Sequence, residues 1–315
     1  MSKVLIGLNS FNDLSYLRES LPMLEQLRQE LPADVVLLDT AWNDEVRDFV
    51  MQKYPHFTYV RHPDGNIGYG RSYNEMWRRF PGHELFLVVT SDVLLNPVVV
   101  KRFVKKMQED ASLTMVAGKL YYWDFSHRCA TGKIDSLGIM AEERHHFYDR
   151  GSGEEDMGQY DSALGHFFGI SGAVFLLRTS VIARLGRAPV GLFDERMWMY
   201  KEDIDLAYRL RSIGEKIVIF PEVWAWHART VANRGGRTFY GLFSADRGKR
   251  GYARLESYQN HFLLLKNNFS FELGPRIFLK VLVYEMGKAF YMFFRSPKVF
   301  WVGLWTLLFV PEDYT

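Results

Sequence analysis

Three carboxylates gather at the start of a segment with helical spacing, and they are Glu202, Asp203 and Asp205. Leu206, Leu210 and Ile213 follow at i, i+4 and i+7, which is the spacing of one buried helix stripe. Asp203 precedes this stripe by one turn, so we expect its side chain to point inward. An acid at this position either caps the helix or, beside a substrate, accepts a proton from a hydroxyl.

A second group combines one acid with one histidine. Asp92 ends the run Thr90-Ser91-Asp92, which follows an apolar stretch, and His227 lies further along the chain. A carboxylate, an imidazole, water and diphosphate oxygens suffice for Mg²⁺ or Mn²⁺, because Mg²⁺ keeps several of its waters. The alternative for His227 is a core histidine, since Trp224 and Trp226 are its neighbours in the chain.

Closely spaced glycines form a third candidate site, around Gly68 and Gly70. Glycine permits a positive φ and a close approach of the backbone to a ligand. The dinucleotide fingerprint is incomplete, because Tyr73 stands where the third glycine belongs. A nucleotide-dependent oxidoreductase is therefore a weaker alternative, and a plain structural turn is another.

Apolar runs alternate with helical patterns in the N-terminal part of the chain. Strands are predicted at 4–8, 35–38, 58–60, 85–89 and 114–117, and helices at 14–27, 46–50 and 99–107. This alternation predicts an α/β fold, a mostly parallel sheet with helices on both faces. Ligands of such sheets bind beyond the carboxyl ends of the strands, where Asn9, Asp39, Asn66 and Asp92 fall.

The ordered motifs resemble family 2 glycosyltransferases of the GT-A fold, in particular the bacterial rhamnosyltransferase-like branch. The stretches that carry the resemblance are 169–178, 191–196, 199–211, 220–222 and 226–227. The resemblance implies that Asp203 is the general base of an inverting enzyme, and that Asp92 and His227 hold Mg²⁺ or Mn²⁺. This sequence departs from the family at Thr90, which replaces the first acid of the metal-binding motif.

The same resemblance implies a nucleotide diphosphate sugar donor. The residues expected to contact it are Asn9, Asp39, Asn66, Gly68, Arg71, Asn74 and Ser91. Arg71 is expected at a phosphate, and Trp42 is a candidate for stacking on the base. Asp39 begins a stretch that matches the family only at its first and last acids, and its alternative role is that of a turn former.

Two regions lie outside this pattern. Residues 122–166 are polar and too long for a plain connection, so they predict an insertion that shapes the pocket of a catalytic domain at 1–228. Residues 229–315 predict a flexible basic loop followed by C-terminal helices, whose aromatic and basic residues favour contact with a membrane surface. Internal packing or a homo-oligomer contact is the alternative for these helices.

Composition narrows the class of protein. A net charge of +2 among 315 residues does not indicate a nucleic-acid binder. The single cysteine, Cys129, excludes an intramolecular disulfide and is typical of a reducing compartment. The N-terminus has no secretory signal, so we expect a protein that is either free in the cytoplasm or peripherally attached to the inner face of the cell membrane.

Together these features predict an inverting glycosyltransferase of cell-envelope glycan assembly. The resemblance favours rhamnose as the sugar and a lipid-linked or polysaccharide acceptor. The alternative is a non-catalytic sugar-nucleotide or membrane-binding protein, suggested by the missing acid at Thr90.

Overall fold

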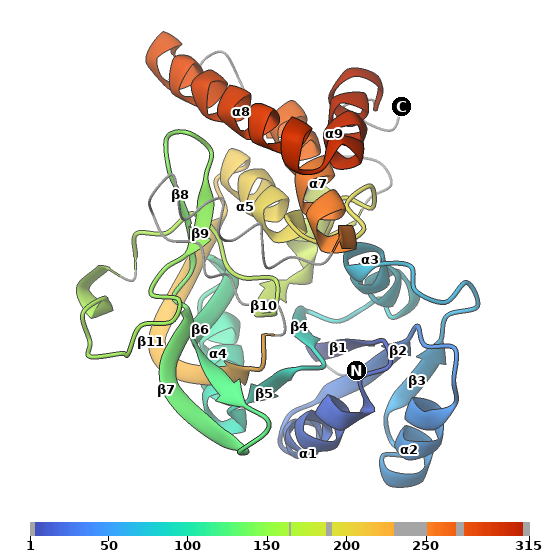
Figure 1. The fold of residues 1–315 in the computed structure, drawn as a ribbon. Coiled ribbons are helices and arrows are strands. Elements are labelled where there is room, and N and C mark those ends of the chain that lie inside the picture. The colour runs from blue at the N-terminus through green and yellow to red at the C-terminus, as the bar shows by residue number, and fades with distance from the viewer. Residues whose placement is uncertain (1–3, 164, 187–190, 230–250, 269–273, 311–315) are drawn as a thin grey trace.

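A nine-stranded mixed sheet forms the centre of the molecule (Figure 1). The computed structural model describes residues 4–163, 165–186, 191–229, 251–268 and 274–310. The strands of this sheet are β1 (Val4–Ser10), β2 (Ala33–Asp39), β3 (Thr58–Arg61), β4 (Leu85–Thr90), β5 (Val93–Leu95), β6 (Leu113–Asp124), β7 (Cys129–Ser136), β10 (Val174–Arg178) and β11 (Lys216–His227). Two short strands, β8 (Ile139–Ala141) and β9 (Phe147–Asp149), form a separate hairpin.

The strand order is β3-β2-β1-β4-β10-β6-β11-β5, with β7 paired to β6. Strands β1, β2, β3 and β4 are parallel, and β6 and β11 form a further parallel pair. Strand β10 is antiparallel to both β4 and β6, so it joins these two parallel groups in one sheet. The central strands are almost wholly apolar and buried, as expected when helices cover both faces.

Helices surround the sheet on both sides, which confirms the predicted α/β class. They are α1 (Leu14–Glu30), α2 (Glu45–Lys53), α3 (Tyr69–Arg79), α4 (Pro97–Glu109) and α5 (Glu202–Ser212). Figure 1 shows α3 on one side of the parallel strands and α1 and α2 on the other. The stripe Leu17, Leu21, Leu24 and Leu27 of α1 is buried, as its spacing of three and four predicts.

Helix α3 begins where the sequence analysis expected only a glycine loop. Gly68 has a φ of 86° and precedes the first helical residue, and the apolar positions Tyr73 and Met76 are buried. Their spacing contained the helical signal, but the closely spaced glycines concealed it. Residues 122–166 also contain more structure than the predicted polar excursion, because β6 extends to Asp124 and β7 pairs with it.

The C-terminal helices are α7 (Gly251–Asn268), α8 (Pro275–Arg295) and α9 (Pro297–Phe309). They have a small core of their own, made of Tyr258, Phe262, Leu265, Val281, Met292 and Val299. Gly303 lets α9 approach α7 closely, since a Cβ there would lie 2.5 Å from the Tyr258 ring. In Figure 1, α8 and α9 lie at the end of the molecule farthest from α1 and α2. None of the described helices has the length and hydropathy needed to span a bilayer.

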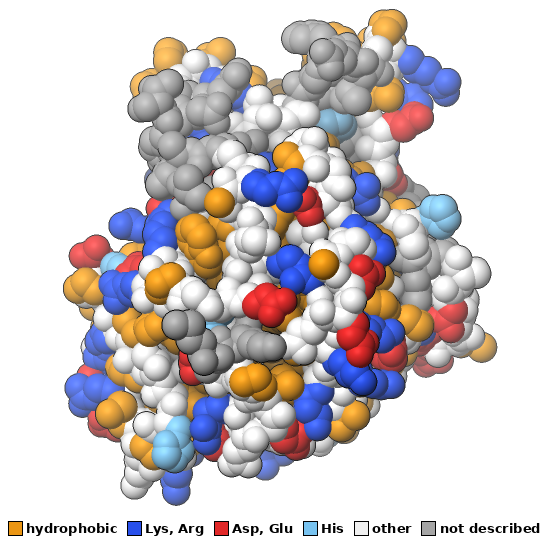
Figure 2. All heavy atoms as spheres, turned by 180° about the vertical axis from the view of Figure 1, so that it is seen from behind, with side chains coloured by type: hydrophobic (Ala, Val, Ile, Leu, Met, Phe, Trp, Pro, Cys, Tyr) orange, Lys and Arg blue, Asp and Glu red, His pale blue; other side chains and the backbone are white. Residues whose placement is uncertain are grey.

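The face of the molecule opposite to that in Figure 1 carries both signs of charge. Figure 2 shows Lys and Arg side chains interspersed with Asp and Glu side chains and with small apolar groups. This mixture agrees with the nearly balanced charge of the sequence.

Candidate functional site

The predicted site residues meet along one edge of the sheet because of strand direction. Ser10 at the end of β1 pairs with Asp39 at the end of β2, and Asn9 pairs with Thr90 at the end of β4. Strand β10 runs the opposite way, so its start lies at this same edge, where Thr90 N donates to Ala173 O at 3.0 Å. Asp92, two residues after Thr90, therefore lies near the loop that precedes β10.

Asp203 lies against that loop. Its Oδ2 accepts a hydrogen bond from Gly172 N at 3.0 Å, and its Oδ1 accepts one from Ile204 N at 2.8 Å. Tyr69 of α3 donates its hydroxyl to Gly172 O, which holds the same loop from the other side. Burial raises the pKa of Asp203, although the Gly172 N–H acts in the opposite direction. Asp203 is thus a half-buried carboxylate with raised basicity, anchored at two points.

The two neighbouring acids have different surroundings. Glu202 is buried, its Oε2 has no hydrogen-bond partner among the described residues, and burial together with the Asp203 charge raises its pKa well above the ordinary range. Asp205 is fully buried and forms an ion pair with Arg209 at 2.8 Å. Asp205 therefore stabilises the helix and its surroundings, while Asp203 is the acid that faces the edge of the sheet.

Asp92 and His227 also meet, as the sequence analysis expected. Asp92 Oδ2 lies 3.2 Å from His227 Nε2, and Ala228 N donates to Asp92 O at 3.0 Å. Burial alone would raise the pKa of Asp92, but His227 and the Thr90 hydroxyl lower it. Burial would likewise lower the pKa of His227, but Asp92 and Asp135 raise it to about 10.

The sequence analysis missed the residues that hold His227 in place. Asp135 of β7 is 0% exposed, and its Oδ2 lies 2.7 Å from His227 Nδ1. Arg229 donates to Asp135 Oδ1 at 3.0 Å and also to Asp149 Oδ2. Asp135 and Asp149 belong to the segment interpreted as an insertion, and Arg229 was assigned to the basic loop. No local spacing signals this network, because β7, β9 and the end of β11 are brought together only by folding.

The pair Asp92–His227 fits a divalent cation. Two donors on one cation lie about 3 Å apart when each is about 2.1 Å from the ion, and these two atoms are 3.2 Å apart. The Asp135 carboxylate occupies Nδ1, so Nε2 can bind a metal once it has released its proton, which is the usual arrangement of metal-binding histidines. Among the described residues, no three His, Cys, Asp or Glu side chains are grouped to hold a metal by themselves. Water and donor oxygens would have to complete the shell.

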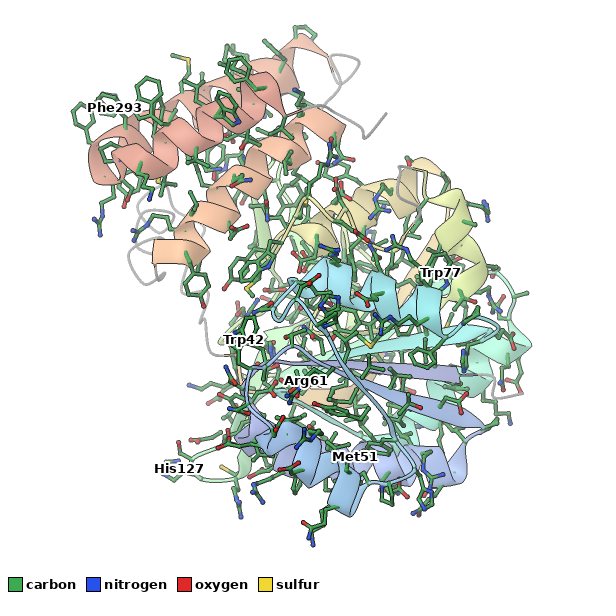
Figure 3. The ribbon with its side chains drawn as sticks, turned by 90° about the vertical axis from the view of Figure 1, so that its right-hand side faces the viewer. Trp42, Met51, Arg61, Trp77, His127 and Phe293 are labelled. Carbon is green, nitrogen blue, oxygen red and sulfur yellow. The ribbon has the colours of Figure 1, made fainter. Side chains whose placement is uncertain are left out.

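Asp39 lies at the predicted end of β2 and is fully buried. Its Oδ2 accepts from Tyr59 at 2.6 Å and from Arg61 at 3.2 Å, and its Oδ1 accepts from Ala41 N at 2.9 Å. Figure 3 shows Trp42 above Arg61 on the same side of the molecule. Trp42 is 74% exposed and its ring covers Gly65. Contact of Asp39 or Trp42 with a nucleoside stays a prediction.

Gly68 and Gly70 allow close packing of the protein around the start of α3. A Cβ at Gly68 would lie 2.4 Å from the Trp198 ring, and one at Gly70 would lie 2.9 Å from Phe193. The space beside both glycines is therefore filled by protein, which argues against a dinucleotide pyrophosphate there. Asn66 Oδ1 accepts from Gly68 N at 3.0 Å and shapes the same turn.

Asn74 has its amide committed to the protein itself. Asn74 Nδ2 donates to Phe193 O at 2.8 Å, and its Oδ1 accepts from Phe193 N at 2.9 Å. It thereby fixes the loop that leads to Asp203. Arg71 is exposed, whereas Asn9 has a buried Oδ1 without a partner among the described residues. Donor contacts by these residues stay predictions.

Asp13 is a further acid at this edge that the sequence analysis did not select. Its Oδ1 accepts from Ser10 at 2.5 Å, and Ser91, which is buried, also contacts its carboxylate. Burial raises the pKa of Asp13 despite these hydrogen bonds. Asp92 and Asp13 both act on the buried Tyr73 hydroxyl, so the two acids share one neighbourhood.

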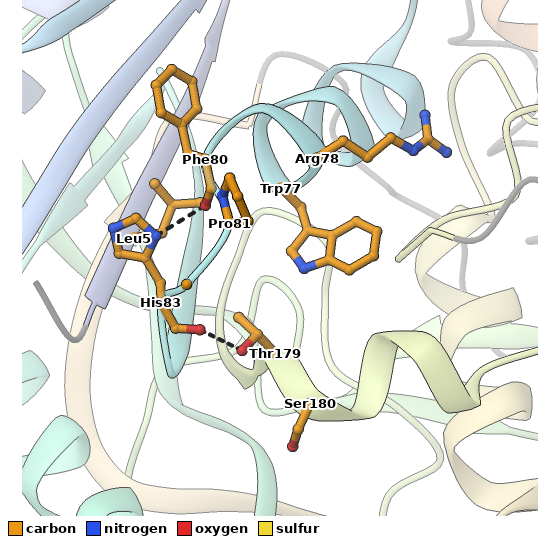
Figure 4. Close-up of a pocket in the computed structure, with 9 residues that line it drawn as sticks. Leu5, Trp77, Arg78, Phe80, Pro81, His83, Thr179 and Ser180 are labelled. Atoms are coloured by element: carbon orange, nitrogen blue, oxygen red, sulfur yellow. Dashed lines mark hydrogen bonds between the residues drawn. The ribbon is translucent and has the colours of Figure 1, made fainter. Parts of the chain in front are cut away.

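A surface pocket of 410 Å³ lies away from this chemistry (Figure 4). Trp77, Phe80, Pro81 and Thr179 line it, together with Leu5 near the start of β1. Leu5 pairs with Phe86 at the beginning of β4, so the pocket is at the amino ends of these strands. Ligands of parallel sheets bind at the opposite ends, and we therefore do not assign the donor to this pocket.

Comparisons with known proteins show the family and the fold of the chain. The model of the glycosyltransferase like family 2 matches residues 4–238. The fold is similar to that of the mannosyltransferase PcManGT from Pyrobaculum calidifontis, solved with GDP-Man and Mn²⁺, at 16% identity and a TM-score of 0.52 over 96% of this chain and 73% of that chain. It is also similar to a TarS fragment from S. aureus, at 12% identity and a TM-score of 0.55 over 97% and 81% of the two chains.

A third similar structure is GalNAc-T7 with UDP, GalNAc and Mn²⁺, at 11% identity and a TM-score of 0.60. The alignment covers 84% of this chain but only 48% of that one. No curated protein matches the chain. At these identities the likeness shows the fold alone, which is the predicted GT-A fold. Because the family model covers well over half of the sequence, the chain belongs to the glycosyltransferase like family 2.

Proposed function

We propose that the protein is an inverting glycosyltransferase that transfers a sugar from a nucleotide diphosphate donor to an acceptor hydroxyl, with Asp203 as the general base. The observation that carries the proposal is the placement of Asp203, whose half-buried carboxylate has a raised pKa and accepts a hydrogen bond from Gly172 N at the carboxyl edge of the sheet. The Asp92–His227 pair belongs to that same edge. The proposed base and the residues proposed to bind the cation thus lie at the same edge of the sheet.

The carboxylate of Asp203 is suited to receive a proton. Each of its oxygens accepts one backbone hydrogen bond, and a carboxylate oxygen can accept a second bond from a hydroxyl. As the acceptor oxygen forms its bond to the anomeric carbon, its proton passes to Asp203. The bond from that carbon to the diphosphate breaks on the opposite face, and its electron pair leaves with the diphosphate. One displacement of this kind inverts the configuration.

Asp92 and His227 are the residues that would hold Mg²⁺ or Mn²⁺. The ion, when bound, supplies positive charge beside the leaving diphosphate. Thr90 does not restore the missing acid, but its hydroxyl helps to lower the pKa of Asp92. One acid and one histidine, with Asp135 orienting the histidine, are the protein's own contribution to this site.

The donor is proposed to lie across the ends of β1, β2 and β4. Solved structures of similar fold contain GDP-Man or UDP, which supports a nucleotide diphosphate sugar here. The sequence resemblance favours thymidine diphosphate rhamnose. A thermal-shift screen with guanosine, uridine and thymidine diphosphate sugars, with and without Mn²⁺, tests this choice. A larger shift with a guanosine or uridine donor than with the thymidine donor would reject rhamnose transfer from thymidine diphosphate.

Turnover separates an enzyme from the non-catalytic alternative. We expect the donor selected by the screen to be consumed in the presence of a hydroxyl acceptor. Binding of a donor without any transfer to saccharide or lipid-linked acceptors would favour a sugar-nucleotide-binding protein instead.

The acceptor is proposed to be lipid-linked and reached at the inner face of the membrane. Helices α8 and α9 expose a row of large apolar side chains, each between 58% and 69% exposed, comprising Leu279, Val283, Met286, Phe290, Phe294, Trp301, Trp305, Leu308 and Phe309. The members on α8 recur at i, i+4, i+7, i+11 and i+15, which is one helix face. Figure 3 shows Phe293 projecting from the outer side of α8. Monomers rarely leave so large an apolar surface uncovered.

Charge supports an anionic membrane as the partner of this face. Residues 275–309 contain the basic side chains Arg276, Lys280, Lys288, Arg295 and Lys298, against the single acid Glu285. Each basic residue near an anionic surface contributes about 1 kcal/mol to binding. Two copies of a segment with this excess of positive charge would repel each other, so the charge favours a bilayer over a homo-oligomer contact.

Cosedimentation with vesicles tests the membrane proposal. The parent protein should bind phosphatidylglycerol vesicles more strongly than phosphatidylcholine vesicles. Arg295→Gln with Lys298→Gln should weaken binding to the anionic vesicles, and Trp301→Ser with Trp305→Ser should weaken binding to both. Parent-like cosedimentation of both double variants, with a dimer in sedimentation velocity, would assign the face to self-association.

A further inference from the structure

Helix α7 contacts residues 194–205, the segment that contains Asp203, through three asparagines. Asn267 Nδ2 donates to Asp194 Oδ2 at 3.2 Å, and Asn268 Nδ2 donates to Asp205 Oδ1 at 3.1 Å. Between these contacts, Leu263 and Leu264 of α7 pack in one buried cluster with Met197 and Ile204. The segment from Asp194 to Asp205 is thus held along much of its length by one helix of the C-terminal part.

The third asparagine, Asn260, contacts the most unusual backbone in this segment. Tyr200 and Lys201 both have a φ of 73°, which is the left-handed region. Side chains other than glycine seldom occupy that region, and two in succession are rarer still. Such conformations persist only where the surrounding structure holds them, and they cluster at functional sites. The turn lies directly before Glu202 and Asp203.

Asn260 is fully buried and bonds to the carbonyls of this turn. Its Nδ2 donates to Met199 O at 2.8 Å and to Tyr200 O at 2.9 Å. A side-chain amide has two N–H donors, so both are used by the turn. The next carbonyl, Lys201 O, accepts the hydrogen bond of Asp205 N at 3.0 Å and so begins the hydrogen bonding of α5. The position of the turn therefore sets where the first turn of α5, and Asp203 within it, begins.

We propose that Asn260 is a positioning residue for the catalytic base: by holding the left-handed turn at Tyr200 and Lys201, it orients the Asp203 carboxylate toward the acceptor. The inference rests on the proposed role of Asp203 as base. It extends the site to the C-terminal helices. The two side-chain hydrogen bonds of Asn260 go to the turn before α5, and not to the strand ends or to the Asp92–His227 pair. Asn260 acts on catalysis only through the geometry of Asp203.

Substitution of Asn260 should affect turnover and leave donor binding unchanged. Asn260→Ala removes both donors, and Asn260→Asp places a carboxylate against two carbonyl oxygens. A misplacement of about 1 Å in a catalytic group can lower a rate about 10²-fold, so we expect kcat to fall about 10- to 100-fold in both variants. The donor Kd, measured by titration, should stay at the parent value. Gln259→Ala, one residue away on the same helix and turned by about 100°, is the matched control and should behave like the parent.

A second substitution separates positioning from general stabilisation. Glycine adopts the left-handed region without the cost that other residues incur. Lys201→Gly combined with Asn260→Ala should therefore recover part of the kcat lost in Asn260→Ala alone. A merely structural role of Asn260 predicts no such recovery, because the glycine adds no contact to α7.

Hydrogen exchange tests the same geometry without reference to activity. The amide of Asp205 should exchange faster in Asn260→Ala than in the parent and more slowly again in the double variant. Parent-like kcat and exchange in Asn260→Ala would overturn the proposal, and so would failure of both Asn260→Ala and the double variant to fold. A parent protein that transfers no sugar would overturn the proposed function instead, while the exchange measurement would still decide whether Asn260 holds the turn.

Discussion

Two acidic clusters at one edge of the sheet differ in the direction of their pKa shifts. At the start of α5, burial raises the pKa of Asp203, and burial with the Asp203 charge raises that of Glu202. At the ends of β4 and β11, His227 lowers the pKa of Asp92, while Asp92 and Asp135 raise that of His227 to about 10. Partial burial acts to raise the pKa of the acid in both clusters, so burial alone does not explain the difference. The partner does.

Asp203 has backbone N–H groups as partners, whereas Asp92 has an imidazole. A carboxyl group with a raised pKa is suited to take and release a proton near neutral pH. A carboxylate with a lowered pKa keeps its negative charge and is suited to hold a cation. Environments that push titrating groups apart in this way assign their roles, and each prediction below acts on one side of this comparison.

The largest expected effect is the loss of the base. Asp203→Asn keeps the shape of the side chain and can still accept the Gly172 N–H bond, but it cannot take a proton. A positioned base contributes about 10²–10⁴-fold to a rate, so kcat should fall by at least about 10²-fold. Donor Kd and Tm, measured by titration and calorimetry, should stay close to the parent values.

Asp205→Asn is the matched comparison for this variant. It weakens the buried ion pair with Arg209 and so should lower stability, by about 3 kcal/mol if the pair is lost. The fall in kcat measured below the Tm of the variant should be much smaller than for Asp203→Asn. If Asp205→Asn removed turnover while Asp203→Asn retained it, the base would have been assigned to the wrong carboxylate.

The next effect concerns the other cluster. Asp135→Asn removes the carboxylate that orients His227, and loss of such a partner typically lowers metal affinity about 10- to 100-fold. We expect this loss for Mn²⁺, measured by calorimetric titration in the presence of the nucleoside diphosphate. Asp92→Ala should abolish the metal-dependent gain in nucleotide affinity altogether. Unchanged nucleotide affinity with and without Mn²⁺ in the parent protein would show that the pair does not hold a cation.

The pH dependence of turnover should report the raised pKa of Asp203. Activity requires the ionised base, so kcat should rise with pH through the folded-state pKa, which lies above the ordinary value of 3.8. This rise of kcat with pH should shift to another pH in variants that change the surroundings of Asp203. It should be absent from the residual activity of Asp203→Asn. A pH profile identical in parent and variant would mean that another group titrates.

The smallest effect is a gain in stability from Glu202→Gln. The folded state keeps the Glu202 proton to a higher pH than the unfolded chain does, because burial raises the folded-state pKa above 4.5. The unfolded state therefore binds fewer protons in this window, and stability falls as pH rises from 4.5 toward the folded-state pKa. Glutamine removes this loss. Chemical denaturation should show a gain in stability at pH 8 and none at pH 4, whereas an equal change at both pH values would point to packing.

Prediction from the sequence succeeded where a pattern is local. The buried strands at 4–8, 35–38 and 85–89 are runs of apolar residues, and the polar residues after them fall at one edge because parallel strands end together. The buried stripe that contains Leu206 and Leu210 predicted α5, with Asp203 near its start. Asp92, in the turn after β4, and His227, at the end of β11, lie together as the family resemblance implied.

The tertiary structure alone decided which neighbours these residues have. Asp135 and Asp149 are ordinary polar residues in the sequence, and they become partners of His227 and Arg229 only because β7 and β9 fold against the end of β11. Asn260 stands 57 positions beyond Asp203 (260 − 203), yet its two hydrogen bonds hold the turn that starts α5. Periodicity records which face of an element is buried, since burial of apolar surface repeats with the helix or strand. It does not record the pairing of single polar groups, because a hydrogen bond depends on distances of a few ångströms between elements that only the folded chain defines.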